Sequence, residues 1–281
     1  MRISCGRLRR GLTSIAGVMA CAVLISSTLS QPASAAACGK TGSGFQSWLS
    51  AYKAKAKSAG ISQRTLQRAL TNVSYDPRVI RRDRSQKSFK LSFNQFYKRR
   101  VGSSLMKRGR TRMRKYAGLL GRLEKRYGVP REVLISIWGL ETNYGKDGSG
   151  KYSIIRSIAT LAYDCRRSKF FTGHLDAALR IVQKGDMSPK QLRGGWAGEI
   201  GQVQFLPGSY DKYAVDFDGN GKRDLVRSIP DALASVANYL KAYGWQRGAP
   251  WGPGTANYKV IKGWNRADVY ARTIAAMAKK L

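Results

Sequence analysis

The segment ISIWGLETNYG, residues 135–145, decides the fold class, because it is an apolar run that carries one acidic residue. The residues VPREVL, 129–134, come directly before it. Together the two stretches predict a helix with Pro130 in its first turn and Gly145 at its end. Glu141 follows Ile137 by four positions and Trp138 by three, so it shares their helix face. Because a buried carboxylate is costly unless it is paired or protonated, Glu141 is either part of a buried polar network or a catalytic acid.

Two features of this position are expected to raise the pKa of Glu141. Apolar neighbours disfavour the charged form, and the last turn of a helix repels an anion. An acid that stays protonated near neutral pH is what the cleavage of a glycosidic bond requires. Glycosidases ordinarily use a second carboxylate, but Glu124, Glu132 and Glu199 stand in less apolar contexts than Glu141. A mechanism with a single acid is therefore worth considering, and the alternative is that folding brings an aspartate close to Glu141.

Helical periodicity outside this segment predicts a mostly α protein. Helices are expected at 45–59, 62–70, 112–128, 175–185 and 230–245. By contrast, VSYDPRVIRRD, residues 73–83, is expected to be an extended connection, because Pro77 disfavours helix at Asp76. Convincing strands are few, and the chain has no internal repeat.

The chain is strongly basic. Its 281 residues include 51 Lys or Arg and 16 Asp or Glu, a formal net charge of +35, which indicates a polyanionic surrounding. Residues 78–115 hold 15 of the basic residues and one acid, with Phe93, Phe96 and Tyr97 between them. Basic residues with aromatics can bind nucleic acid, but helical spacing favours aromatics turned inward below a solvated cationic face. That face could hold an anionic wall polymer.

The first residues predict export. Basic residues 2–10 precede the apolar stretch 11–29 and the small residues of QPASAAAC, residues 31–38. We expect a signal peptide at 1–35, cut after Ala35. The mature protein should then be periplasmic or secreted, without stable membrane insertion. The alternatives are an uncleaved anchor or a lipoprotein at Cys38, whose preceding residues lack the usual leucine. Export also argues against a nucleic-acid partner.

After cleavage the chain keeps two cysteines, Cys38 and Cys165. In an oxidising compartment they are expected to form a disulfide, the alternative being two free thiols. His174 is the only histidine, which argues against a zinc site and against a Ser-His-Asp hydrolase.

Several segments together resemble the family B lytic murein transglycosylases. ISIWGLETNYG, YDCRRSKFF, GWAGEIGQVQFLPGSYDKYAVDFDGNGK and SVANYLKAYGW stand in the order of that family's motifs, and the likeness spans roughly residues 40–281. It implies a lysozyme-like α fold with a small irregular or β portion. It also implies cleavage of the MurNAc–GlcNAc β-1,4 bond without water, leaving a 1,6-anhydromuramyl end. Glu141 would serve as acid and then as base, with no cofactor required.

The resemblance also implies binding residues, with peptidoglycan glycan strands as the partner of a monomer. They are Gln204, Arg166, Arg167, Tyr239, Asn265, Tyr270 and, as a weaker match, Tyr97. Core packing is the alternative for the tyrosines, and a solvated helix start is the alternative for the arginines. Two departures matter: Gly195 stands where family members often have serine, and segment 246–263 is shorter than their insertion.

An acidic loop, DFDGNGKRD at residues 216–224, stands out in this basic chain. Its spacing matches the opening of an EF-hand, although Arg227 occupies the place of the usual final glutamate. The resemblance suggests Asp231 as the closing ligand of a structural calcium site. The candidate ligands are Asp216, Asp218, Asn220, Lys222 and Asp231. The alternative is an Asx-rich turn without metal.

The predicted organisation has three parts: the signal peptide 1–35, a basic helical region 36–110 that packs on the core, and a lysozyme-like catalytic core 111–281 that contains the acidic loop 216–231. A muramidase-type hydrolase on the same fold is the nearest alternative function. A non-catalytic wall-binding module is another, and a secreted nucleic-acid binder ranks last.

Overall fold

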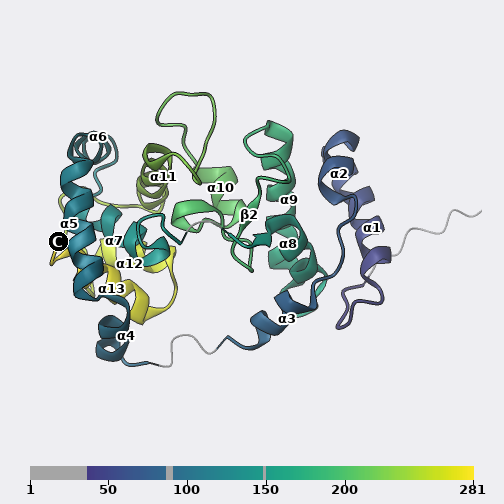
Figure 1. The fold of residues 1–281 in the computed structure, drawn as a ribbon, viewed down its shortest axis with the longest axis horizontal. Helices are drawn as coiled ribbons and strands as arrows, with labels where there is room; N and C mark the ends of the chain where they lie inside the picture. Colours follow the sequence, from purple (N-terminus) through teal and green to yellow (C-terminus); the bar gives the residue numbers. More distant parts are fainter. Residues whose placement is uncertain (1–36, 87–90, 148–149) are drawn as a thin grey trace, which may run out of the picture. The chain divides into compact units, whose positions relative to one another are not determined.

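The computed structural model describes residues 37–86, 91–147 and 150–281, which are mostly helical (Figure 1). The predicted mostly α class is confirmed. The expected signal peptide lies outside the described residues. Within the described residues, no helix combines the length and the apolarity that crossing a membrane requires.

The first three helices are α1 (Phe45–Ser58), α2 (Gln63–Leu70) and α3 (Pro77–Arg84), and α1–α3 contact α8 (Ile154–Tyr163) or α9 (Ser168–Lys184). The predicted extended connection at 73–83 is wrong, because α3 occupies most of it. Asp76 is extended, as a residue before proline should be, but its side chain accepts a hydrogen bond from the Arg78 amide at 3.0 Å. Asp76 therefore caps a helix that Pro77 begins.

The basic segment forms α4 (Phe93–Arg100) and α5 (Ser103–Lys115), which α6 (Ala117–Tyr127) follows. The single helix expected at 112–128 is interrupted at Tyr116, whose φ of −108° and ψ of 23° end α5 and precede α6. The domain boundary expected after residue 110 falls within α5.

Helix α7 (Arg131–Thr142) is buried on nearly every side, which explains its unbroken apolar sequence. It contacts α5, α6, α11 (Ile229–Ala242), α13 (Asp268–Ala278) and the short 3-10 helix η1 (Gly201–Val203). Gly139 and Gly109 permit the close approach of α7 and α5 around the Tyr144 hydroxyl, since an added Cβ would lie 2.7 Å or 2.6 Å from it. The helix ends before Gly145, because Asn143 is already left-handed.

A two-stranded antiparallel sheet joins β1 (Tyr152–Ser153) to β2 (Arg193–Gly194), with Tyr152 opposite Gly194. Isolated bridges from Ile200 to Gly194 and to Phe205 fold the following loop back on β2. The loop leads through η1 to α10 (Pro207–Tyr213), and α12 (Ala256–Trp264) follows α11. The small β portion expected beside the helices is thus present.

The predicted disulfide between Cys38 and Cys165 is confirmed. It joins the chain just before α1 to the turn between α8 and α9. A hydrogen bond of 2.9 Å from the Gly39 amide to the Tyr163 carbonyl lies beside it. The disulfide and this bond attach the start of the described chain to α8.

Candidate active site

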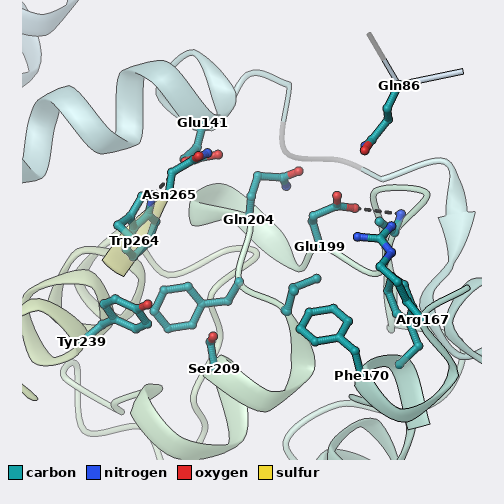
Figure 2. A pocket seen from close by; sticks show the side chains of 14 residues that line it. Gln86, Glu141, Arg167, Phe170, Glu199, Gln204, Ser209, Tyr239, Trp264 and Asn265 are labelled. Carbon is teal, nitrogen blue, oxygen red and sulfur yellow. Dashed lines mark hydrogen bonds between the residues drawn. The ribbon is translucent and has the colours of Figure 1, made fainter. Parts of the chain in front are cut away.

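A cavity of about 390 Å³ opens at the C-terminal end of α7 (Figure 2). Its walls come from α7, the start of α9, the loop between β2 and α10, α11 and the end of α12. Carboxyl groups, amides and aromatic rings converge on it: Gln86, Glu141, Arg167, Phe170, Phe171, Ala197, Glu199, Gln204, Phe205, Leu206, Ser209, Tyr239, Trp264 and Asn265. A concave site with converging polar groups suits ligand binding.

Glu141 reaches this cavity from the last turn of α7. Its Oε1 accepts hydrogen bonds from Trp264 Nε1 and from the Tyr270 hydroxyl, each at 2.9 Å. Burial raises the pKa of Glu141, and the two hydrogen bonds, which favour the charged form, oppose that rise only in part. The carboxyl group is therefore biased toward its protonated form, as a general acid requires.

Arg100, at the end of α4, is a neighbour of Glu141 that sequence reasoning missed. Its guanidinium donates to the Leu140 carbonyl at 2.5 Å, and its positive charge lowers the pKa of Tyr270, against the effect of burial. The same charge lowers the pKa of Glu141, also against the effect of burial. Arg100 belongs to a long basic run, so residue type gave no signal. Trp264 was also missed, although it directly precedes the predicted Asn265.

A second carboxyl group, Glu199, lines the same cavity (Figure 2). Its Oε2 accepts a hydrogen bond from the Ala197 amide at 3.0 Å, and burial raises its pKa. The charge of Glu199 in turn raises the pKa of Glu141. A second carboxyl group thus lies at the Glu141 cavity, because the bridges around Ile200 fold the loop of Glu199 onto this site.

Gly195 leaves the space that the Glu199 carboxyl group fills. A Cβ at Gly195 would lie 2.1 Å from Glu199 Oε2, so a larger residue at position 195 would displace this carboxyl group. The glycine at position 195, where family members often have serine, thus leaves room for the Glu199 carboxyl group.

Four of the predicted binding residues line the cavity: Arg167, Gln204, Tyr239 and Asn265. Gln204 has a left-handed backbone with φ of 52°, and its side-chain amide donates to the Gly201 carbonyl at 2.7 Å. The Tyr239 hydroxyl donates to the Gly263 carbonyl at 2.8 Å. These bonds fix the orientation of both side chains at the cavity wall.

The remaining predicted residues lie outside the lining. Tyr270 stands behind Glu141 as its hydrogen-bond donor. Arg166 donates to the buried Asp83 at 2.6 Å, and Arg167 donates to the same oxygen while also reaching the cavity. Tyr97 lies beside α13, where Lys280 Nζ is 5.0 Å from its ring centroid.

A second cavity of about 670 Å³ continues the first and shares Arg167, Phe170, Leu206, Ser209, Tyr239 and Trp264 with it. Tyr243 lies on it, with its ring stacked on Tyr239 at 4.2 Å between centroids. Lys212 and Arg266 add positive charge to its lining. The two cavities form one groove with aromatic surfaces and cations.

The acidic loop brings three of its candidate ligands together. Carboxylate oxygens of Asp216, Asp218 and Asp231 lie within 4.8 Å of one another. Like charges this close favour a bound cation, and oxygen ligands suit calcium. Backbone amides already bond these carboxylates, and the Asn220 side chain accepts from the Lys222 amide at 2.9 Å. The residues fit a calcium ion, and they equally fit the alternative of an Asx-rich turn.

Comparison with known proteins identifies relatives. The chain is 42% identical to "Membrane-bound lytic murein transglycosylase B" of Escherichia coli K12 over 134 residues, which are 47% of this chain and 37% of that protein. The chain thus spans well under half the length of this relative. SltB3 of Pseudomonas aeruginosa, solved with NAG-anhNAM-pentapeptide, has a TM-score of 0.78 and 33% identity, covering 86% of this chain and 80% of SltB3.

The lytic transglycosylase Slt35 of Escherichia coli, solved with bulgecin A, has a TM-score of 0.73 and 25% identity, covering 87% of this chain and 95% of Slt35. The expected fold of a lysozyme-like lytic transglycosylase is thereby confirmed. A family model described as "Transglycosylase SLT domain" matches residues 44–255. The chain therefore belongs to the transglycosylase SLT domain family.

Proposed function

We propose that this protein is a lytic transglycosylase that cleaves the MurNAc–GlcNAc bond of peptidoglycan. One observation carries the proposal: the Glu141 carboxyl group, biased toward protonation, is held by Trp264 and Tyr270 at a groove of aromatic rings and amides. Family membership and the names of the relatives support the same activity. So does the anhydro-sugar fragment bound to SltB3, since this reaction yields such an end.

Glu141 performs both proton transfers. First its carboxyl proton passes to the glycosidic oxygen while the bond from that oxygen to the muramyl C1 breaks, which releases the GlcNAc 4-hydroxyl. The muramyl C6 hydroxyl then attacks C1, and its proton passes to the Glu141 carboxylate. The product is a 1,6-anhydromuramyl end, no water is consumed, and Glu141 is protonated again. Trp264 and Tyr270 stabilise the carboxylate between the two steps through their bonds to Oε1.

The groove provides positions for the strand. Gln204 and Asn265 can bond the sugars next to the cleaved bond, and Tyr239 with its stacked neighbour offers an aromatic surface for a sugar face. Arg167 can attract the carboxylates of peptide stems. Arg166 and Tyr97 stand away from the lining, so their proposed contribution is to hold Asp83 and the face of α13 in place.

The test is digestion of purified sacculi by the exported chain and by Glu141→Gln, with the released muropeptides measured by mass spectrometry. We expect anhydro-ended fragments from the unmodified protein alone. Sacculus binding without any release by either protein would refute the enzyme and favour the wall-binding module.

Glu199 supports one alternative, a muramidase-type hydrolase on the same fold. A second carboxyl group in the cavity could orient a water molecule. The same digestion separates the two reactions, because hydrolysis gives reducing ends that are one water heavier. Under the proposed function, Glu199→Gln still releases fragments with anhydro ends. A hydrolase would release reducing ends, and Glu199→Gln would remove most of its activity.

We further propose that the chain acts as a monomer in the periplasm or outside the cell, after cleavage behind Ala35. A calcium ion would have a structural role only, held by carboxylates of Asp216, Asp218 and Asp231 with Asn220 and the Lys222 backbone nearby. It would keep the loop before α11 folded, and no step of the reaction uses it.

A further inference from the structure

The basic segment of α4 and α5 has no acidic residue of its own: residues 91–115 include nine Lys or Arg and no Asp or Glu. Two of the arginines on α5 contact residues of α7 or of its C-terminal end. Arg108 donates to the Asn143 side chain at 2.6 Å, and the Arg112 guanidinium lies 6.0 Å from the Trp138 ring centroid. These two side chains hold α5 against the end of α7 and need no external partner.

The opposite side of α5 presents exposed cations that pair with no acidic side chain among the described residues. Lys107, Arg110 and Arg114 are exposed at intervals of three and four positions, so they share one side of the helix. Arg110 donates to the Lys280 carbonyl at 3.3 Å, which brings the exposed Lys280 beside them. None of these four residues, here called the α5 cationic face, takes part in an ion pair within the described chain.

Uncompensated cations this close together attract a polyanion. The exposed residues of α5 are serine, threonine, lysine and arginine. Helix α5 therefore contributes no exposed aromatic ring that could stack on unpaired bases and no exposed apolar side chain that could enter a lipid interface. The ring beside Lys280 is that of the half-buried Tyr97, which the Lys280 ammonium already contacts. An anion that meets the α5 cationic face is held by charge alone, as a flexible polymer of spaced carboxylates would be.

We propose that the α5 cationic face is a second contact with peptidoglycan, which binds the carboxylates of peptide stems on strands outside the groove. The inference rests on the proposed function, since it takes the same polymer as partner. Helix α5 packs directly on α7, which carries Glu141. Stems held on this face would keep the protein on the sacculus between cleavage events.

The test measures binding rather than cleavage. Every protein carries Glu141→Gln, so that sacculi stay intact, and the bound fraction is measured against salt concentration. The test variant adds Lys107→Gln, Arg110→Gln and Arg114→Gln. The control adds Lys55→Gln, Lys57→Gln and Arg68→Gln, which remove three exposed cations from α1 and α2. Each protein is also tested on sacculi whose carboxylates are blocked by amidation.

We expect the test variant to bind native sacculi roughly tenfold more weakly at low salt, since each exposed ionic contact contributes a few-fold. The control should bind like its parent, and on amidated sacculi or in high salt the difference should vanish. Equal binding by test and control variants would overturn the proposal. The proposal would also be overturned if the parent bound duplex DNA or anionic vesicles more tightly than sacculi and the test variant lost that binding.

The proposed function can fail without this inference. If sacculus binding depends on the α5 charges but the unmodified protein releases no anhydro product, the α5 binding face is supported and the proposed transglycosylase activity is refuted. If anhydro products form but sacculus binding is the same after amidation of the carboxylates, the transglycosylase activity is supported and the α5 binding face is refuted.

Discussion

Replacing Tyr270 by phenylalanine should shift the pH dependence of cleavage upward. The Tyr270 hydroxyl donates one of the two hydrogen bonds that Glu141 Oε1 accepts, at 2.9 Å. Burial and the charge of Glu141 raise the pKa of Tyr270 well above its ordinary value, so it stays a donor at every working pH. Phenylalanine keeps the ring and removes only the donor.

The magnitude follows from how the bond depends on the charge of Glu141. A hydrogen bond to a charged group is worth about 1.5–3 kcal/mol and one between neutral groups about 0.5–1.5 kcal/mol. The difference, roughly 1–1.5 kcal/mol, favours the carboxylate and changes the ionisation equilibrium by about tenfold. Without the bond the pKa of Glu141 rises further. The acid then stays protonated to higher pH, so the alkaline limb of kcat/KM moves up.

The assay is the release of anhydro muropeptides from sacculi across pH 4 to 9, for the unmodified protein, Tyr270→Phe and the control Tyr239→Phe. The Tyr239 hydroxyl bonds a backbone carbonyl and not Glu141, so its removal should lower activity without moving the limb. Trp264→Phe, which removes the other donor to Oε1, should move the limb like Tyr270→Phe. A limb that stays fixed in both variants would refute the assignment of Glu141 as the titrating acid.

Three further changes test stability. Burial raises the pKa of Glu141, so folding favours the protonated form, and the unmodified protein loses stability as pH rises above the ordinary glutamate range. Glu141→Gln should therefore have a higher Tm at pH 7. This difference in Tm should disappear toward pH 4. Cys38→Ser with Cys165→Ser opens a loop of 127 positions and should cost up to about 5 kcal/mol, or roughly 10 °C of Tm by calorimetry. Added calcium should raise Tm, and Asp231→Asn should abolish that rise; an equal rise in both proteins would leave the loop an Asx-rich turn.

Local sequence predicted those parts of the fold that depend on local physics. The apolar run around Trp138 predicted a buried helix, and Ser62 correctly predicted a helix start. The errors arose where two local rules compete. Pro77 forces the residue before it to be extended, but it also suits the first turn of a helix, and the cap by Asp76 decides between these outcomes.

The site was predictable only where its chemistry was visible in one segment. Glu141 stands out because its neighbours on the same helix are apolar. Arg100 and Glu199 do not, because their importance comes from contacts across the fold: α4 packs on α13 beside Tyr270, and bridges at Ile200 turn the loop of Glu199 inward. Sequence separation hides both contacts.

The high net charge and the raised pKa of Glu141 conflict only if charge is treated as uniform over the molecule. Positive groups lower the pKa of a carboxyl group, and Arg100 does so at Glu141, yet burial outweighs it and the Glu199 charge adds to the rise. Exposed cations such as Lys107 and Arg110 are screened by solvent and salt and act weakly on a buried group. Removing them should therefore change how the protein meets a polyanion while leaving the protonation of Glu141 unchanged. The acid depends on its immediate surroundings, and the surface charge is free to serve binding.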